Sequence, residues 1–220
     1  MHEKLKFIKQ LDFFNSLNNE ELEIISEIST ISKHTKESIL YYENDTYDKL
    51  FFLVSGLLKV YKVDKYNNEI FLYHIYENSL VSELSVIDRA AIHCFSNTQF
   101  LEDSIVLEVD FFEFKKRFLS QNILNSEFIN EILLKTHQLH CVVNRELVFD
   151  ATSKVAYMLC DDLAMFNKLK RQEVSFMLHI QPETLSRVLK KLKRAEIIDV
   201  DHSQIIIKDI KALKNIYKGE

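Results

Sequence analysis

The sequence predicts an α+β chain in three parts: an N-terminal antiparallel β-roll (a jelly-roll-like double-stranded β-helix), a long helix and a C-terminal winged helix-turn-helix. Three observations predict it. Short runs of β-branched and aromatic residues fill much of 38–109, a helical period follows, and the tail combines two helices around a tight turn with two short strands. We place the parts at 1–120, 121–150 and 151–220.

Residues 1–35 are expected to be helical with short loops, because Leu22, Ile25 and Ile28 follow a helical spacing. The period then changes to short runs separated by polar turn residues, which is typical of an antiparallel roll. Glycine occurs only at positions 56 and 219, so we expect Asn and Asp to occupy the turns. The predicted strands are 38–42, 50–54, 57–63, 70–76 and 104–109.

A long helix is predicted from Asn125 to Leu147, after a short helix that Asp110 caps. Its apolar residues alternate spacings of three and four, which is typical of the seam of a two-helix coiled coil. The alternative is a helix that lies on its own domain. We expect Phe128, Leu133 and Val142 to serve an intramolecular face. The predicted dimer seam consists of Ile129, Ile132, Thr136, Leu139 and Val143.

The tail is expected to begin with one amphipathic helix from Ala151 to Phe166. Two further helices then flank a turn at 179–181, where His179 takes the tight position that glycine often occupies. Pro182 suits the first turn of the second helix, because no N–H is needed there. Two strands, 197–200 and 204–207, form the wing, and Asp209 caps a last helix.

The second of these helices has segregated faces, and this pattern predicts a DNA recognition helix. Glu183, Ser186 and Arg187 lie on its outward face near the start, where such helices contact bases. Arg187 can bond guanine bidentately, and Glu183 can accept from cytosine or orient Arg187. The side chains expected to contact phosphates or flank the site are Gln181, Thr184, Lys190, Lys191 and the wing residue His202.

The charge distribution agrees with a polyanionic partner for the tail alone. Residues 1–150 carry 15 Lys/Arg and 24 Asp/Glu, whereas residues 151–220 carry 13 Lys/Arg and 9 Asp/Glu. The alternative is a small-ligand-binding regulatory module whose winged helix contacts protein rather than DNA. Adjacent carboxylates such as Asp161 and Asp162 point apart on a helix, and no phosphate loop or nucleophile motif is present, so we expect no enzyme.

These motifs resemble the Crp/Fnr superfamily of bacterial transcription regulators over nearly the whole chain. Phe14-Asn15-Ser16-Leu17 matches the family's opening, 50–61 matches its first hairpin with Ser55-Gly56, and Glu183, Ser186 and Arg187 match the Fnr-like recognition pattern. The resemblance implies a homodimer on double-stranded DNA with inverted TTGA-like half-sites. It also implies RNA polymerase as a partner if the protein is an activator.

The sensor part departs from the cyclic-nucleotide-binding relatives that it resembles. Their phosphate cassette begins Gly-Glu-Leu, which here is Ser82-Glu83-Leu84, and ends Arg-Ser, which falls near His93-Cys94 and is missing. The candidate effector region is therefore Ser82, Glu83, Leu84, Arg89, His93 and Cys94, and the sequence argues against cyclic AMP.

The cofactor is left open by the sequence. No cysteine precedes Cys94, which argues against the cysteine-held iron–sulfur cluster of the oxygen-sensing relatives. Haem or nitric-oxide sensing, thiol sensing through Cys94 or Cys141, and an unknown ligand remain as alternatives. The candidate haem ligands are His74, His93, His137 and His140. No signal peptide or apolar run of membrane-spanning length appears, so we expect a cytoplasmic protein.

Overall fold

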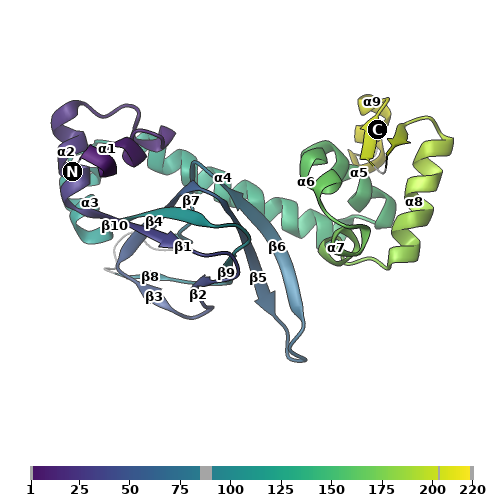
Figure 1. Cartoon of the computed structure of the whole chain (residues 1–220), viewed down its shortest axis with the longest axis horizontal. Helices are drawn as coiled ribbons and strands as arrows, with labels where there is room; N and C mark the ends of the chain where they lie inside the picture. Colours follow the sequence, from purple (N-terminus) through teal and green to yellow (C-terminus); the bar gives the residue numbers. More distant parts are fainter. Residues whose placement is uncertain (1, 85–90, 203, 219–220) are drawn as a thin grey trace. The chain divides into compact units, whose positions relative to one another are not determined.

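The computed structural model describes residues 2–84, 91–202 and 204–218, which form two compact units, Met1–Leu139 and His140–Glu220 (Figure 1). The N-terminal unit begins with helices, continues with ten strands and ends with helices among these described residues. Its helices are α1 (His2–Ile8), the 3-10 turn Asp12–Phe14, α2 (Asn19–Glu27), α3 (Phe111–Arg117), the 3-10 turn Leu119–Gln121 and α4 (Asn125–Val143). Its strands are β1 (Ser29–His34), β2 (Ile39–Tyr41), β3 (Thr46–Tyr47), β4 (Lys49–Ser55), β5 (Leu57–Val63), β6 (Glu69–Tyr76), β7 (Ser79–Leu80), β8 (Ile92–His93), β9 (Asn97–Phe100) and β10 (Ser104–Asp110).

The strands form a roll of antiparallel sheets, which confirms the predicted fold class. One four-stranded sheet has the order β1-β10-β4-β7 and the other the order β2-β9-β5-β6, while β3 pairs with β8. β5 and β6 are consecutive along the chain, but most neighbouring strands are distant in sequence, as when Ile39 of β2 pairs with Gln99 of β9. This topology brings the segment around residues 93–96 next to residues 44–45 and 83, so that the candidate sensor residues His93 and Cys94 lie near the candidate Glu83.

Strand β1 corrects the expectation that residues 1–35 are helical. Helix α2 does form, and Asn18 caps it by accepting from the N–H of Glu21 at 3.0 Å. The chain then becomes extended at Ser29 and pairs with β10 over six residues, from Ser29 opposite Val109 to His34 opposite Ser104. The residues of β1 include two β-branched side chains and no helical apolar spacing, so pairing with β10 decides its conformation.

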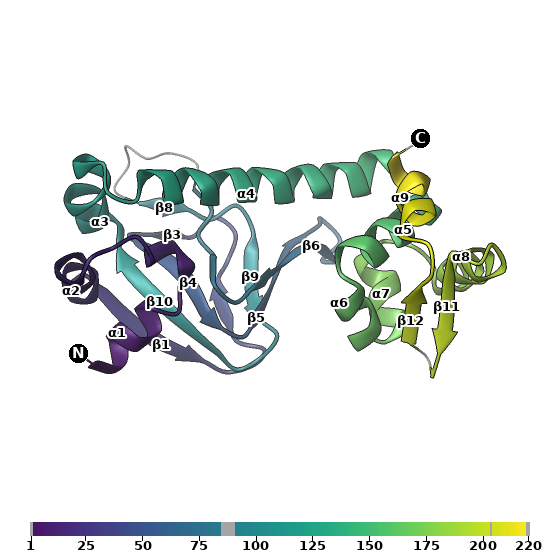
Figure 2. The ribbon, with the colours of Figure 1, turned by 90° about the horizontal axis from the view of Figure 1, so that it is seen from above.

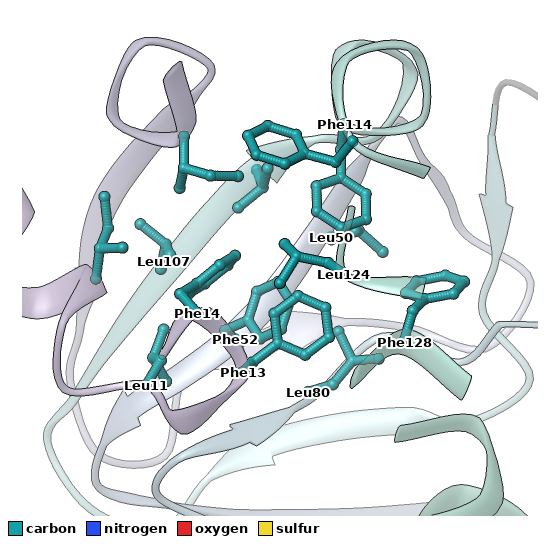
Figure 3. Packing of buried hydrophobic residues seen from close by; sticks show 14 of the residues in the cluster. Leu11, Phe13, Phe14, Leu50, Phe52, Leu80, Leu107, Phe114, Leu124 and Phe128 are labelled. Carbon is teal, nitrogen blue, oxygen red and sulfur yellow. The ribbon is translucent and has the colours of Figure 1, made fainter. Parts of the chain in front are cut away.

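A cluster of phenylalanines fills the space between the first sheet and the flanking helices (Figure 3). The ring of Phe52, on β4, lies 4.9 Å from that of Phe13 and 5.2 Å from that of Phe14, centroid to centroid. Phe114 of α3 and Phe128 of α4 close the cluster from the other helices. Each of these buried aromatic side chains removes a large apolar area from water and so stabilises the unit.

Turns that lack glycine use asparagine, as the sequence predicts. Asn44, Asn67 and Asn78 have φ values of 72°, 65° and 61°, in the left-handed region. Gly56 also has a positive φ, of 108°, between β4 and β5. A Cβ at this position would lie 2.1 Å from the hydroxyl oxygen of Ser104, so the close approach of β10 requires a glycine here.

The residues that helix α4 buries against its own unit differ in part from the sequence prediction. Phe128 is buried as expected, but Leu133, expected to face its own domain, is 59% exposed. Ile132 packs partly against the phenylalanine cluster instead. The α-helix ends at Val143 and continues as one π-helical turn over Asn144–Val148. The prediction assigned the inward face one residue too late, to Leu133 instead of Ile132. On a helix, successive residues point to different faces, so a shift of one position exchanges a buried residue for an exposed one.

The C-terminal unit consists, among its described residues, of helices with a two-stranded wing. The elements are α5 (Ala151–Asp161), α6 (Leu163–Lys168), α7 (Arg171–Met177), α8 (Pro182–Arg194), β11 (Ile198–Asp201), β12 (Gln204–Ile207) and α9 (Ile210–Lys218), seen in Figure 2. The single helix expected over 151–166 is wrong, because it is broken at Asp162. The Asp162 side chain accepts from the N–H of Met165 at 2.9 Å and starts α6.

Candidate nucleic-acid interface and sensor region

The turn between α7 and α8 is built around a histidine in the left-handed conformation. His179 has φ of 50°, and the N–H groups of His179 and Ile180 donate to the carbonyl oxygens of Phe176 and Ser175 at 3.1 Å each. Pro182 then occupies the first turn of α8. The predicted turn over 179–181 is therefore confirmed in its conformation, and it fixes where α8 begins.

Helix α8 separates its apolar and polar side chains onto opposite faces. Leu185, Val188 and Leu192 are 1%, 7% and 1% exposed and anchor the helix to its unit. The outward side carries exposed polar and charged groups, which are Glu183, Ser186, Arg187, Lys190 and Lys191. All residues that the sequence assigned to base or phosphate contact on this helix are thus accessible, apart from Thr184, which is half-buried.

One contact on α8 was not anticipated. The Nη2 of Arg187 donates to the hydroxyl oxygen of Thr184 at 3.2 Å, one turn earlier on the helix. The bond aligns the guanidinium along the outward face, where its fork of N–H donors can meet a pair of acceptors. Gln181 precedes the helix and is exposed.

The wing is tied to α8 by an ionic cluster that the sequence did not reveal. Asp199 of β11 receives Lys193 at 3.0 Å and Lys208 at 3.2 Å. The hydrogen bond from Lys193 is the main reason that the pKa of Asp199 lies well below its usual range. His202 lies beyond it at the wing tip, with its side chain 95% exposed and its Nδ1 2.7 Å from Asp201.

A second unanticipated cluster surrounds Glu146 in the π-helical turn. Its carboxylate lies 2.7 Å from Nε of Arg145, 2.8 Å from Nδ1 of His179 and 3.7 Å from Nζ of Lys154. Burial raises the pKa of Glu146, but the hydrogen bonds from His179 and Arg145 outweigh burial and hold it below its ordinary value. The contact joins the segment after α4 to the turn before α8.

Of the six predicted sensor residues, Glu83 contacts the segment that follows Cys94, whereas Ser82 and Leu84 make other contacts. Glu83 accepts from the N–H groups of Phe95 and Ser96, next to Cys94. Ser82 accepts from the N–H of Phe51 at 2.8 Å and is buried. Leu84 packs against the phenylalanine cluster, away from this group. Arg89 lies outside the described residues.

Cys94 is unsuited to thiol chemistry in this environment. Its side chain is 2% exposed, and burial raises its pKa to about 12, with Glu83 and Asp45 adding to the rise. A thiol reacts as the thiolate, which such a pKa disfavours at neutral pH. Cys141 instead accepts a hydrogen bond from the hydroxyl of Tyr157 at 2.9 Å.

The four candidate haem ligands occupy separate places. His74 lies against Phe71 of its own strand, with ring centroids 4.8 Å apart, and His93 meets the Phe95 ring edge-on at 4.8 Å. His137 and His140 are exposed on α4. Within the described ranges, no three His, Cys, Asp or Glu side chains form a group able to hold a metal ion.

The predicted dimer seam is largely exposed in the single chain. Ile129, Leu139 and Val143 are 55%, 53% and 48% exposed, and Thr136 is exposed while its hydroxyl donates to the carbonyl of Ile132 at 2.9 Å. Ile132 itself packs partly on its own unit.

Among the helices that the structure describes, none has the length and apolar character to span a bilayer.

Comparison with known proteins gives matches to both parts of the chain. Residues 32–121 match the model of a cyclic nucleotide-binding domain, and residues 154–216 match that of a Crp-like helix-turn-helix domain. The anaerobic regulatory protein of Bacillus subtilis (strain 168) is 21% identical over 203 residues, covering 87% of this chain and 84% of that protein.

Solved structures share the fold at low sequence identity. A CooA mutant from Carboxydothermus hydrogenoformans has a TM-score of 0.72 at 20% identity and covers 94% of this chain and 95% of that one. FixK2 from Bradyrhizobium japonicum has a TM-score of 0.63 at 18% identity, with coverage of 86% and 97%. A structure of CprK in complex with OCPA has a TM-score of 0.65 at 18% identity, with coverage of 88% and 93%.

Proposed function

Since the chain belongs to the Crp/Fnr superfamily of transcription regulators, with a DNA-binding helix-turn-helix, we propose that it binds inverted repeats of TTGA-like half-sites as a homodimer. The observation that carries the proposal is the outward face of α8, where Glu183, Ser186 and Arg187 are exposed. A dimer would place two such helices in successive major grooves, about 10 base pairs apart.

Each residue of this face has a defined role in the proposal. Arg187 donates two bonds to guanine O6 and N7, and Glu183 accepts from cytosine N4 or orients Arg187. Ser186 lies between them on the same face and contacts a base edge. The phosphate contacts come from Gln181, Thr184, Lys190, Lys191 and His202, which hold the helix in register.

The dimer forms through α4 in this proposal. The exposed side chains of Ile129, Leu139 and Val143 make an apolar surface that a second α4 can cover, with Thr136 satisfied by its own helix. Ile132 lies at the edge of this surface. As an activator the dimer would also contact RNA polymerase.

The signal acts on the β-roll or on α4, and haem with nitric oxide is one hypothesis for it. His74, His93, His137 and His140 are the candidate ligands. The absorption spectrum of protein purified without oxygen tests this part separately, because a Soret band requires haem. A colourless sample would refute the haem hypothesis and leave the DNA-binding proposal untouched.

Substitution of Arg187 tests the DNA-binding proposal. Arg187→Ala should weaken binding to a TTGA-type palindrome by about 1–3 kcal/mol and relax base preference at the contacted position. The matched control is Lys211→Ala, which removes an exposed cation on α9 in the same unit. Footprinting and gel shifts on the palindrome and on a scrambled duplex give both quantities.

Two outcomes would contradict the proposal. If Arg187→Ala binds the palindrome as tightly as the unchanged protein, the assignment of Arg187 is wrong. If the unchanged protein shows no steep salt dependence on any duplex, its winged helix does not engage phosphates, and the alternative of protein contacts gains support.

A further inference from the structure

The carboxylate of Glu83 occupies a set of donors that would suit a free oxyanion. One oxygen accepts from the N–H of Phe95 at 2.8 Å and from the N–H of Ser96 at 3.1 Å, and the other accepts from the Ser96 hydroxyl at 2.8 Å. Two successive backbone N–H groups beside a hydroxyl form an anion-binding nest. We call the amides of Phe95 and Ser96 with the Ser96 hydroxyl the 95–96 nest.

The carboxylate in the 95–96 nest also has a counter-charge. Lys135 of α4 is attracted by Glu83 and by Glu131, and its ammonium donates to the carbonyl oxygen of Val81 at 3.3 Å. The same ammonium lies 5.9 Å from the centre of the Tyr73 ring. Three parts of the unit, the segment after β7, the segment before β9 and α4, therefore contribute opposite charges or hydrogen-bond donors to the surroundings of this carboxylate.

These residues do not fit a cyclic nucleotide, although residues 32–121 match a cyclic nucleotide-binding domain. The resemblance places the phosphate-binding Arg-Ser pair near 93–95, where the chain has His93-Cys94-Phe95 and no arginine. The donors that do exist there already hold Glu83. A phosphate in the same nest would meet a carboxylate within hydrogen-bonding distance of the same amides, and like charges at that separation repel strongly.

We propose that Glu83 is the resident anion of this sensor, so that the β-roll takes no cyclic nucleotide and its 95–96 nest accepts a small external oxyanion only when the Glu83 carboxylate is removed. The carboxylate does for the fold what a bound anion would do, because it satisfies three hydrogen-bond donors of the chain and attracts the ammonium of Lys135. The proposal concerns the β-roll and is independent of DNA binding.

Chemical rescue tests the proposal directly. Glu83→Ala should lower the thermal midpoint by about 5–10 °C, because three charge-assisted hydrogen bonds are lost. Sodium acetate at tens of millimolar should then restore much of this loss relative to sodium chloride of equal ionic strength, since acetate replaces the missing side-chain carboxylate. Glu77→Ala, which removes an exposed carboxylate before β7, is the matched control and should neither lose stability nor respond to acetate.

The response of the variants to acetate either supports or overturns the proposal. Selective acetate stabilisation of Glu83→Ala supports the proposal. Equal acetate effects on the unchanged protein and on both variants, or no loss of stability in Glu83→Ala, overturn it. If Glu83→Ala does not fold, Glu83→Gln decides instead: its amide fills the nest without charge, so it should melt lower than the unchanged protein and gain nothing from acetate.

Cyclic nucleotide binding gives an independent measurement. Calorimetric titration of the unchanged protein with cyclic AMP and cyclic GMP should show no saturable binding up to about 1 mM. Saturable micromolar binding of either nucleotide would overturn the proposal even if acetate rescue succeeds.

Discussion

Glu83 in the N-terminal unit and Arg187 in the C-terminal unit are both charged side chains, but they use their charge differently. The carboxylate of Glu83 receives three hydrogen bonds from its own unit and attracts the ammonium of Lys135. The guanidinium of Arg187 donates to Thr184 on the same exposed helix face. The first arrangement stabilises a fold, whereas the second aligns a group that another molecule can bind.

A buried aromatic cluster in one unit and an exposed aromatic ring in the other extend the comparison. The β-roll gathers Phe13, Phe14 and Phe52 into one buried cluster (Figure 3). The C-terminal unit leaves Phe176 half exposed on α7, and its α8 contributes one apolar face only. We therefore expect substitutions in the β-roll to act on the free energy of unfolding and substitutions on α8 to act on binding.

The largest expected effect tests the first half of that comparison. Phe52→Ala should lower the free energy of unfolding by about 3–5 kcal/mol, because a ring that is 1% exposed is replaced by a cavity. Phe176→Ala should change it by less than about 0.5 kcal/mol, since Phe176 is 50% exposed. Urea unfolding followed by circular dichroism measures both, and equal losses would contradict the comparison.

Gly56 provides a sharper test, because its role is steric rather than hydrophobic. Gly56→Ala should cost about 2–3 kcal/mol, since φ is 108° and the new Cβ would lie 2.7 Å from the Cβ of Ser104. The double variant Gly56→Ala/Ser104→Gly should recover part of the loss by removing that clash, leaving the strain in φ. A double variant no more stable than Gly56→Ala would show that backbone strain alone accounts for the cost.

The sequence predicts the parts of this fold that local patterns decide. The runs at 57–63 and 104–109 and the turn at His179 follow from residue type and spacing, and the structure confirms them. Strands β3 and β8 have two residues each and exist only because Thr46 and Tyr47 pair with His93 and Ile92. No local pattern announces such strands, because their conformation depends on a partner far away in sequence.

The candidate site follows the same division. The outward face of α8 is local, since Glu183, Ser186 and Arg187 share a helix face by spacing alone. The contacts of Glu83 with Ser96 and of Glu146 with His179 join residues 13 and 33 positions apart. Their geometry depends on how strands and helices meet, so residue types could nominate Glu83 but could not supply its partners.

The buried charge of Lys135 makes a prediction about pH. Burial lowers the pKa of Lys135 to about 8, while Glu83 and Glu131 oppose the fall. Between that value and about 10.5 in the unfolded chain, the unfolded state binds more protons at Lys135, so this group alone makes stability rise with pH from about 8 upward. Cys94 acts in the opposite direction over this range, because its pKa is raised to about 12 in the folded chain. The slope from Lys135 alone is at most about 1.4 kcal/mol per pH unit.

Lys135→Met should lower the slope of stability against pH relative to the unchanged protein, because it leaves no group to titrate at that position while Cys94 is the same in both. Urea unfolding at several pH values between about 8 and 9.5 measures the slope, below the range in which tyrosines titrate. Lys36→Met, which replaces an exposed lysine, is the control and should keep the slope of the unchanged protein. Identical slopes in Lys135→Met and the unchanged protein would show that Lys135 keeps an ordinary pKa and that its ammonium is solvated.

The smallest expected effect concerns Lys190. It tests the second half of the comparison, in which substitutions on α8 act on binding. Lys190 is exposed on α8 one turn beyond Arg187, where it can reach a phosphate but no base edge. Lys190→Ala should therefore weaken palindromic and scrambled duplexes alike, by less than about tenfold at about 0.1 M salt, and reduce the slope of log affinity against log salt by about 1. Gel shifts over a salt series give both values. A loss of affinity confined to the palindrome would assign Lys190 to base contact. An unchanged salt slope would show that Lys190 does not contact DNA, and the DNA-contacting residues of α8 would then lie nearer its first turn.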